Sequence, residues 1–268
     1  GGAGTEAEMG ERGERGTMGK TEKREEKGEM GKMEEAGERG KMGSAGAASI
    51  GASRKLQILI AAIHNEAMHR FEDVARDAAL ETGFFEIEVF SAIRAALQGD
   101  LDPHALLDLG ASGSKLYIVD RGLVRVSHSI NEGGQDLTLG LSRALGVSVS
   151  DAEKLKRAAG LSSGISRKDG GGTLSALLNF IFDEAKRVIS HFERQSGYSV
   201  KELTLLGGGV NLPGLFDVAH SAFSVPVVRA DPFAQVEAPA FLDETLKAVG
   251  PEFAVALGVA FRKLQEAA

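Results

Sequence analysis

Three short stretches of this sequence carry residue types that could bind a charged ligand. The first is Asp108-Leu109-Gly110-Ala111-Ser112-Gly113-Ser114, where a carboxylate at the end of an apolar run precedes a glycine-rich bend. Such a bend presents backbone N–H groups that bind phosphate oxygens, and the aspartate could hold a magnesium-bound water. The same residues also suit an ordinary hairpin turn built from glycine and serine.

The second stretch places three consecutive glycines, Gly207, Gly208 and Gly209, directly after the apolar run that ends at Leu206. Glycines at a strand end let a flat ligand lie against the backbone, and Pro213 stands where a helix with a polar N-terminus could begin. A flexible strand-to-helix loop is the alternative. Three glycines in a row are entropically costly if they have no role.

The third stretch is the run 151–157, in which Glu153 and Lys156 are three residues apart on a predicted helix. This spacing places the two side chains on one helix face. The run therefore predicts either a pair of ligand-facing groups or a solvated ion pair on an exposed surface.

The hydrophobic pattern predicts alternating strands and helices around these stretches. Before the first stretch we expect a β-α-β-α unit: a strand at 56–63, a helix that Asn65 caps and that runs to about Thr82 before Gly83 ends it, a strand at 84–90 and a helix at 91–98. Strands at 105–110, 115–120 and 123–130 should then form an antiparallel meander. After them we expect helices at 133–145, 150–159 and 173–196, a loop at 160–172, a strand at 203–206, a helix from Pro213 to 223, a strand at 225–229 and a helix at 251–265.

Residues 1–53 differ in composition from the rest of the chain. They contain one branched aliphatic residue, Ile50, and no aromatic residue, and they are rich in glycine and charge. Such a segment cannot bury enough apolar surface to offset its ordering entropy, so we expect it to be disordered. Some of its glycines recur every third residue, but a collagen helix also needs proline and a strict register, which are missing.

Composition excludes several classes of function. The net charge of −7 argues against a nucleic-acid partner, and no apolar run approaches the ~20 residues of a membrane span. The absence of cysteine excludes disulfides, thiolate zinc sites and cysteine nucleophiles, and it fits a reducing compartment. The six histidines are scattered without i,i+3 or i,i+4 pairs, which argues against a metal enzyme built on histidine. No Gly-x-Ser-x-Gly elbow stands at a strand-to-helix turn, which argues against a serine hydrolase.

The order of these motifs resembles the second half of actin-like ATPases, and within them the PilM family of type IV pilus assembly proteins more than the related FtsA proteins. The resemblance covers roughly residues 56–263. The stretches that carry it are Leu107-Asp108-Leu109-Gly110-Ala111-Ser112, Ile130-Asn131-Glu132-Gly133-Gly134-Gln135-Asp136-Leu137-Thr138, Ala152-Glu153-Lys154-Leu155-Lys156, His191-Phe192-Glu193-Arg194-Gln195-Ser196-Gly197, the run 205–215, and Ala254-Val255-Ala256-Leu257-Gly258-Val259-Ala260.

The resemblance implies an α/β chain with the actin-like (ribonuclease H-like) ATPase fold, and it implies ATP and Mg²⁺ as ligands. The expected domains are a disordered tract at 1–53, part of an extra subdomain at 54–103 and a nucleotide-binding domain at 104–268. The resemblance also implies that Asp108, Gly110, Ser112 and Ser114 face the β- and γ-phosphates and magnesium, with Asp108 on the metal. Glu153 and Lys156 would approach the ribose and adenine, and Gly207, Gly208 and Gly209 would lie against the adenosine.

One element of the family pattern does not stand in its expected place. Actin-like proteins carry an earlier phosphate hairpin of the form Asp-x-Gly-x-x-x-x-Lys, and the tract 1–53 occupies that position here. The first domain is therefore expected to be incomplete, in an N-terminally truncated or chimeric chain. We expect the affinity for ATP to be reduced, because the nucleotide is normally held from both sides.

The function implied is that of a cytoplasmic scaffold of the type IV pilus inner-membrane platform, peripheral to the membrane through its partners. The implied partner is the N-terminal peptide of a PilN-like membrane protein, and self-association is a further expectation. One alternative is a slow actin-like ATPase, with Gln135 as the candidate for positioning water. Another is an FtsA-like division protein, although the segment 261–268 is only weakly amphipathic, which argues against a membrane-binding terminal helix.

Overall fold

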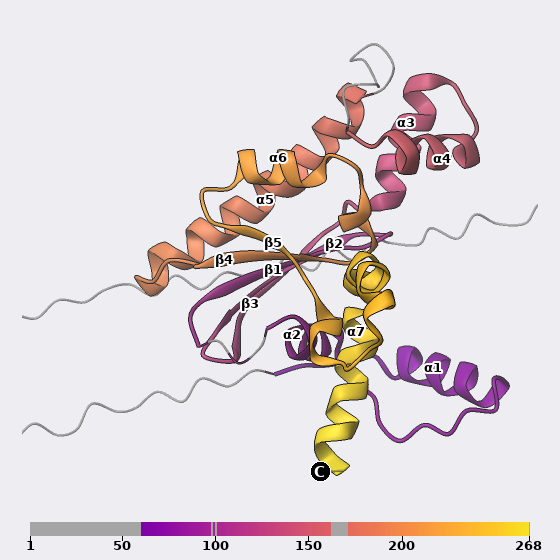
Figure 1. Cartoon of the computed structure of the whole chain (residues 1–268), viewed down its shortest axis with the longest axis vertical. Coiled ribbons are helices and arrows are strands. Elements are labelled where there is room, and N and C mark those ends of the chain that lie inside the picture. Colours follow the sequence, from indigo (N-terminus) through magenta and orange to yellow (C-terminus); the bar gives the residue numbers. More distant parts are fainter. Residues whose placement is uncertain (1–59, 98, 100, 162–170, 268) are drawn as a thin grey trace, which may run out of the picture. The chain divides into compact units, whose positions relative to one another are not determined.

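A mixed five-stranded sheet is the central element of the described part of the chain. The computed structural model describes residues 60–97, 99, 101–161 and 171–267, so the expected disordered tract at 1–53 lies outside the described residues. The described residues from Ile63 onward make up one unit, which is built on a sheet of strand order β3-β2-β1-β4-β5 (Figure 1). The strands are β1 (His104–Leu109), β2 (Ser114–Asp120), β3 (Leu123–Ile130), β4 (Glu202–Leu206) and β5 (Val227–Arg229).

The first three strands form the antiparallel meander that the sequence predicts. β1 pairs with β2 in a register that sets Asp108 opposite Lys115, and β2 pairs with β3. Between β2 and β3, Arg121 and Gly122 have φ angles of 53° and 72°, as a two-residue hairpin turn of the primed type requires. β4 then lies parallel to β1, and β5 lies parallel to β4.

Both faces of the sheet are covered, which explains why β1 is almost continuously apolar. Ala105, Leu107 and Leu109 of β1 belong to the core under α3, α5 and α6, whereas Leu106 belongs to the core under α2 and α7. Figure 1 shows α5 and α6 on one side of the sheet and α2 and α7 on the other. The helices are α1 (Asn65–Asp77), α2 (Glu88–Ala96), α3 (Gly134–Leu145), α4 (Val149–Ala159), α5 (Gly171–Ser196), α6 (Leu215–Ala222) and α7 (Asp243–Ala267).

The two helices on the second face cross at very short range. A Cβ atom placed on Gly258 of α7 would lie 1.9 Å from the backbone oxygen of Ser91 in α2. Ala92 of α2 and Ala254 of α7 are both 1% exposed beside this crossing. Gly258 and these alanines leave no side chain between the two helices, which allows the close approach.

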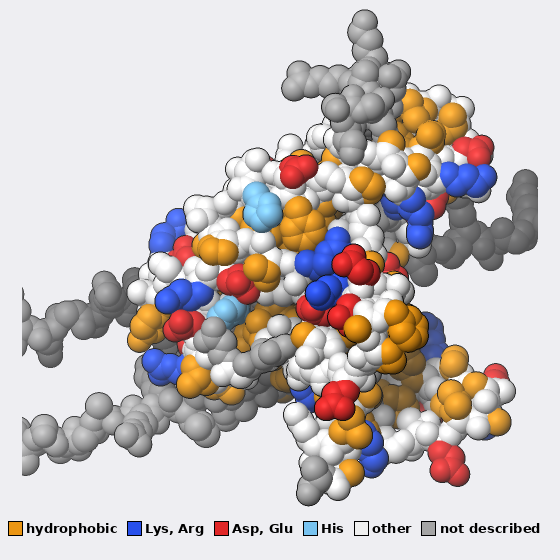
Figure 2. All heavy atoms as spheres, viewed as in Figure 1, with side chains coloured by type: hydrophobic (Ala, Val, Ile, Leu, Met, Phe, Trp, Pro, Cys, Tyr) orange, Lys and Arg blue, Asp and Glu red, His pale blue; other side chains and the backbone are white. Residues whose placement is uncertain are grey.

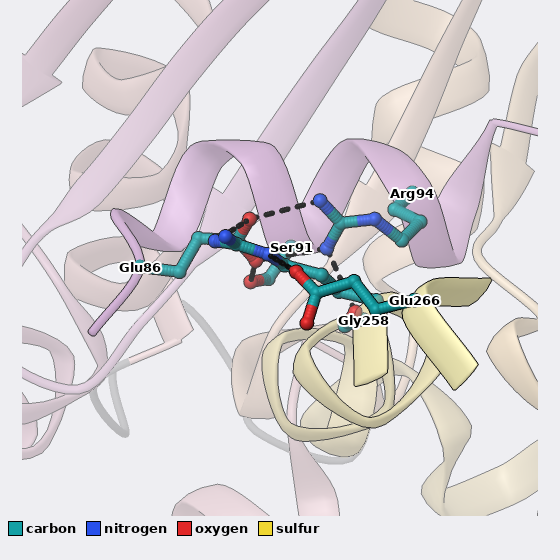
Figure 3. A network of polar contacts seen from close by, with 6 residues as sticks. Glu86, Ser91, Arg94, Gly258 and Glu266 are labelled. Atoms are coloured by element: carbon teal, nitrogen blue, oxygen red, sulfur yellow. Dashed lines mark hydrogen bonds and ion pairs between the residues drawn. The ribbon is translucent and has the colours of Figure 1, made fainter. Parts of the chain in front are cut away.

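A polar network also joins these two helices (Figure 3). The Glu86 carboxylate, just before α2, receives Arg94 Nη1 at 2.8 Å and Arg262 Nη1 of α7 at 3.2 Å. Arg94 Nη1 also donates to the carbonyl oxygen of Gly258 at 2.8 Å. The hydrogen bonds from Arg94 hold the pKa of Glu86 at about 2, although burial acts in the opposite direction. Glu86 is therefore an ionised link between α2 and α7.

The predicted strand at 84–90 is wrong. Residues 81–87 have no regular secondary structure, and α2 already begins at Glu88. The alternation of apolar and acidic residues suggested an amphipathic strand, but the Glu86 side chain is only 6% exposed because it turns inward to the two arginines. The tertiary ion pairs outweighed the local pattern. The predicted helix at 91–98 corresponds to α2, with a start three residues earlier at Glu88.

The remainder of the predicted β-α-β-α unit also differs. Of the predicted strand at 56–63, residues 56–59 lie outside the described part of the chain, and residues 60–63 form no strand and are exposed. α1 ends at Asp77, and Ala79 with φ of 54° follows it, so the helix does not reach Gly83. Large apolar side chains of α1 are exposed, with Phe71 at 62% and Val74 at 66%.

Smaller corrections concern the ends of three helices and one predicted loop. The N-cap residue of α1 is His64, and Asn65 is the first residue inside the helix. Pro213 does not start a helix, because Gly208–Asn211 forms a 3₁₀ turn and α6 begins only at Leu215. α7 begins at Asp243, so Pro251 lies inside that helix. Residues 162–170 of the predicted loop are outside the described residues.

Candidate functional site

The phosphate-type loop of the sequence opens onto a cleft of about 440 Å³. The cleft lies where β1 turns into β2, beside the end of β3 and the start of α2. Of the predicted phosphate-site residues, Asp108, Gly110, Ser112 and Ser114 all contribute to its wall. The other lining residues are Glu88, Ala111, Gly113, Lys115, Ser129, Ile130, Asn131 and Val255.

The Asp108 side chain emerges on the sheet face that α2 and α7 cover. Burial raises the pKa of the Asp108 carboxyl group, the nearby Lys115 ammonium group lowers it, and the Glu88 carboxylate raises it. A partly desolvated carboxylate of this kind gains from a cation brought to it. The position therefore suits a group that contacts a magnesium ion or its bound water.

Two charged residues of the cleft were missed by the sequence analysis. Glu88, at the first turn of α2, and Lys115, at the start of β2, form an ion pair across the cleft. Lys115 could have been found, because the short turn between β1 and β2 places it directly opposite Asp108 on the same sheet face. Glu88 had no such local signal, because its segment was predicted as a strand and its place depends on how α2 packs.

The glycine run after β4 supports the other side of Asp108. Gly207 has φ of 85°, and a Cβ atom on it would lie 2.3 Å from Asp108 Oδ1. A Cβ atom on Gly209 would lie 2.7 Å from the Cβ atom of Leu109, whereas Gly208 has nothing closer than 3.8 Å. The Gly207 N–H donates to the carbonyl oxygen of Pro251 in α7 at 2.9 Å. The first and second motifs of the sequence are thus in direct contact.

The start of α3 is bonded to the phosphate-type loop. The Gly134 N–H donates to the Gly110 carbonyl at 2.9 Å, and the Gln135 N–H donates to the Ala111 carbonyl at 2.8 Å. Ser114 Oγ donates to the Glu132 carbonyl at 2.8 Å, which fixes the end of β3 against the loop. The Gln135 side chain itself is exposed and does not belong to the cleft lining.

Glu153 and Lys156 do not line the 440 Å³ cleft; they join α4 to the first turn of α3. Lys156 Nζ donates to the Gly134 carbonyl and to Thr138 Oγ1, both at 2.8 Å, and pairs with Glu153 Oε2 at 2.8 Å. Burial raises the pKa of Glu153, but hydrogen bonds from Lys156, Thr138 and Arg157 outweigh it and hold the pKa at about 2. These residues reach the loop through Gly134.

A second polar cluster fixes the turn after the glycine run. Arg229 of β5 donates to Asn211 Oδ1 at 2.8 Å, and Asn211 Nδ2 donates to Glu252 Oε1 of α7 at 2.6 Å. The Arg229 guanidinium also lies 5.3 Å from the ring centre of Phe216. The turn Gly208–Asn211 is therefore tied to both β5 and α7.

On the face seen in Figure 2, acidic and basic side chains are interspersed and do not gather by sign.

The residues of the cleft fit a magnesium–nucleotide ligand. The described part of the chain contains no cluster of three or more His, Cys, Asp and Glu side chains that could hold a metal alone. Magnesium needs no such cluster, since it is commonly held by one or two carboxylates together with substrate phosphates. A glycine bend, two serines and a semi-buried aspartate around an open cleft offer that arrangement.

Comparison with known proteins decides the family. The family model of the type IV pilus assembly protein PilM matches residues 47–264. The chain belongs to the PilM family. A solved structure described as a PilM–PilN type IV pilus biogenesis complex is similar, with a TM-score of 0.64 and 26% identity, over 74% of this chain and 58% of that one. The chain thus spans less than two thirds of that relative.

More distant structures show the same fold. The ethanolamine utilization protein EutJ from Carboxydothermus hydrogenoformans matches with a TM-score of 0.52 and 18% identity, over 70% of this chain and 59% of that chain. MreB5 of Spiroplasma citri bound to ADP matches with a TM-score of 0.52 and 15% identity, over 74% and 65%. The predicted actin-like fold class is confirmed. A comparison with curated protein sequences gives no match.

None of the described helices combines the length and the apolar character that a membrane span needs.

Proposed function

We propose that this PilM-family chain is a cytoplasmic scaffold component of the type IV pilus inner-membrane platform, peripheral to the membrane through its partners. The observation that carries the proposal is the match to the PilM family model over residues 47–264. The domain division proposed is 1–53, 54–103 and 104–268. The part 54–103 contributes α2, which packs on α7 and lines the cleft.

The cleft is the proposed site for the phosphates of Mg-ATP. Asp108 would hold the magnesium ion through its water, and the backbone of Gly110 with Ser112 would contact the phosphates. Ser114 already donates its hydroxyl to Glu132, so its contribution is to fix the loop. Gly207, Gly208 and Gly209 would lie against the adenosine, with Glu153 and Lys156 near the ribose and adenine. The fold similarity to an MreB bound to ADP supports a nucleotide ligand.

We expect this chain to bind Mg-ATP weakly. Among the described residues only one hairpin of the phosphate-binding type is present. A phosphate group held from one side makes fewer charge-assisted hydrogen bonds and keeps more of its water.

The proposed macromolecular partner is the N-terminal peptide of a PilN-like membrane protein. Similarity to the PilM–PilN complex supports this choice, at 26% identity. The test is a pulldown of the full chain with an immobilised PilN-like N-terminal peptide, using a scrambled peptide of the same composition as the control. Retention on the native peptide without turnover of ATP supports the scaffold. Equal retention on both peptides contradicts it.

A slow ATPase is the second candidate function. The observation that favours it is Glu88, a carboxylate in the wall of the cleft that could orient a water molecule near the phosphates. Steady-state release of phosphate from ATP, measured for the wild type and for Glu88→Gln, distinguishes the two functions. Turnover that depends on Glu88 favours the enzyme, and its absence in a protein that binds ATP favours the scaffold.

A further inference from the structure

Lys115 holds an unusual position in the cleft. It is the first residue after Ser114 in β2, and the strand register sets it opposite both Asp108 of β1 and Ser129 of β3. Residues paired across antiparallel strands project from the same sheet face, so these three side chains share the face that α2 covers. Glu88 of α2 meets Lys115 there as its ion-pair partner.

The charge of the cleft makes this lysine important. Among the described residues that line the cleft, Glu88 and Asp108 are acidic and Lys115 is the only cation. Without a cation, two carboxylates would repel the negative charges of a phosphate chain. Lys115 pairs with Glu88 and also lowers the pKa of the Asp108 carboxyl group, so its ammonium group lies near both acids of the cleft.

The Lys115 ammonium group can leave Glu88 for another anionic partner. The two side chains are 42% and 55% exposed, and ion pairs with that exposure contribute little net stability. A lysine ammonium group is a compact charge on a flexible four-carbon stem, so it can swing between nearby anions. A phosphate group in the cleft carries more charge than one carboxylate and offers more acceptor oxygens.

We propose that Lys115 is the built-in cation of this cleft: it leaves Glu88 for the phosphates of a bound polyphosphate and allows that ligand to be held without a divalent ion. The inference rests on the proposed phosphate-binding function and adds to it a residue that sets metal dependence. The ligand class is a di- or triphosphate, whether part of a nucleotide or inorganic.

The test is a calorimetric titration of the full chain with ATP and with inorganic pyrophosphate, each in Mg²⁺ buffer and in EDTA buffer. For the wild type, removal of Mg²⁺ should weaken binding by less than about tenfold. For Lys115→Gln the same removal should weaken binding by at least about ten times more, because one unit charge near the phosphates is then missing. Lys115→Arg keeps the charge, so removal of Mg²⁺ should weaken its binding by the same factor as for the wild type.

Two further variants sharpen the test. Glu88→Gln frees Lys115 from its partner and should strengthen binding in EDTA, in the direction opposite to Lys115→Gln. Lys201→Gln is the matched control, because Lys201 also forms a partly exposed ion pair, with Asp102 at 3.3 Å, and does not line the cleft. Thermal melting of each variant confirms that it is folded.

The possible failures are distinguishable. If the wild type binds ATP, and Lys115→Gln shows the same ratio of the dissociation constants in EDTA and in Mg²⁺ buffer as the wild type, the role of Lys115 is overturned and the proposed site survives. If the folded wild type binds neither ligand in either buffer, the proposed phosphate site is overturned and this inference with it. Equal retention of metal-free binding by Lys115→Gln and Lys115→Arg also overturns the inference.

Discussion

Replacing Gly258 by alanine tests the helix crossing that positions α2 against the sheet. The added Cβ atom would lie 1.9 Å from the backbone oxygen of Ser91 and 2.5 Å from its backbone carbon. These are backbone atoms, so no side-chain rotation relieves the overlap, and the two helices must move apart. The movement would open the packing of Ala92 against Ala254 and stretch the hydrogen bond from Arg94 to the residue-258 carbonyl.

The expected loss in the free energy of unfolding is about 3 kcal/mol. Overpacking of a close-packed site costs about 1–3 kcal/mol, and the overlap with backbone favours the upper value. The weakened hydrogen bond adds about 1 kcal/mol, and the better helix propensity of alanine returns about 1 kcal/mol. For a folded unit of this size, the midpoint of thermal unfolding should fall by about 6–12 °C.

The assay is thermal unfolding followed by circular dichroism at 222 nm or by calorimetry, with Gly140→Ala as the matched control. A Cβ atom on Gly140, also inside a helix, would meet only the side-chain ends of Leu177 at 2.9 Å and Thr173 at 3.0 Å. Because those ends can move, this variant should stay within about 1 kcal/mol of the wild type. A Gly258→Ala protein that melts within about 2 °C of the wild type, or above it, would refute the reasoning.

Three further substitutions test other contacts. Glu86→Gln removes a carboxylate whose folded pKa of about 2 is below its ordinary value of 4.5, so its contribution to the free energy of unfolding is present above pH 4.5 and is lost as the pH falls toward 2. In denaturant unfolding, the variant should be less stable than the wild type by about 2–3 kcal/mol at pH 6, and this difference should shrink at pH 4 and pH 3. A difference that stays constant with pH would contradict the ion-pair assignment. Gly207→Ala should destabilise the protein by about 2 kcal/mol or more, because Gly207 has a φ of 85° and lies against Asp108. Gly208→Ala, with space around the added methyl group, should melt close to the wild type. Equal melting points of the two variants would disprove the close contact between Gly207 and the Asp108 loop. Lys156→Met should loosen the start of α3, seen as faster amide exchange at Gly134 and Gln135, whereas Lys154→Met, at an exposed pair, should leave those amides unchanged.

The β1-β2-β3 meander and the helix α5 follow from local patterns in the sequence. Strong apolar runs separated by Gly and Asp fixed the strand positions, and the two-residue turn at Arg121 and Gly122 set the pairing of β2 with β3. The register then carried Asp108 and the glycine bend to the same cleft. These predictions succeeded because strand pairing and turn chemistry are encoded within a few residues of each other.

The segment before β1 could not be predicted in this way. Its structure depends on contacts with α7, which is more than 150 residues away in the sequence, as the Arg94–Gly258 hydrogen bond illustrates. A buried Glu86 looks like a solvent-facing strand residue until its partners Arg94 and Arg262 are known. For the same reason Glu88 escaped notice, although it is one of three charged residues in the wall of the cleft.

The central claim is that the Asp108 loop forms a phosphate-binding site in this chain. Calorimetric titration of the full chain with Mg-ATP, compared with Asp108→Asn and with the exposed control Asp217→Asn, tests it most directly. The account predicts weak binding by the wild type and by Asp217→Asn, with a dissociation constant of about 10 μM to 1 mM, and binding about three- to tenfold weaker for Asp108→Asn. Binding of equal strength by all three proteins, or no binding by the folded wild type, would contradict it.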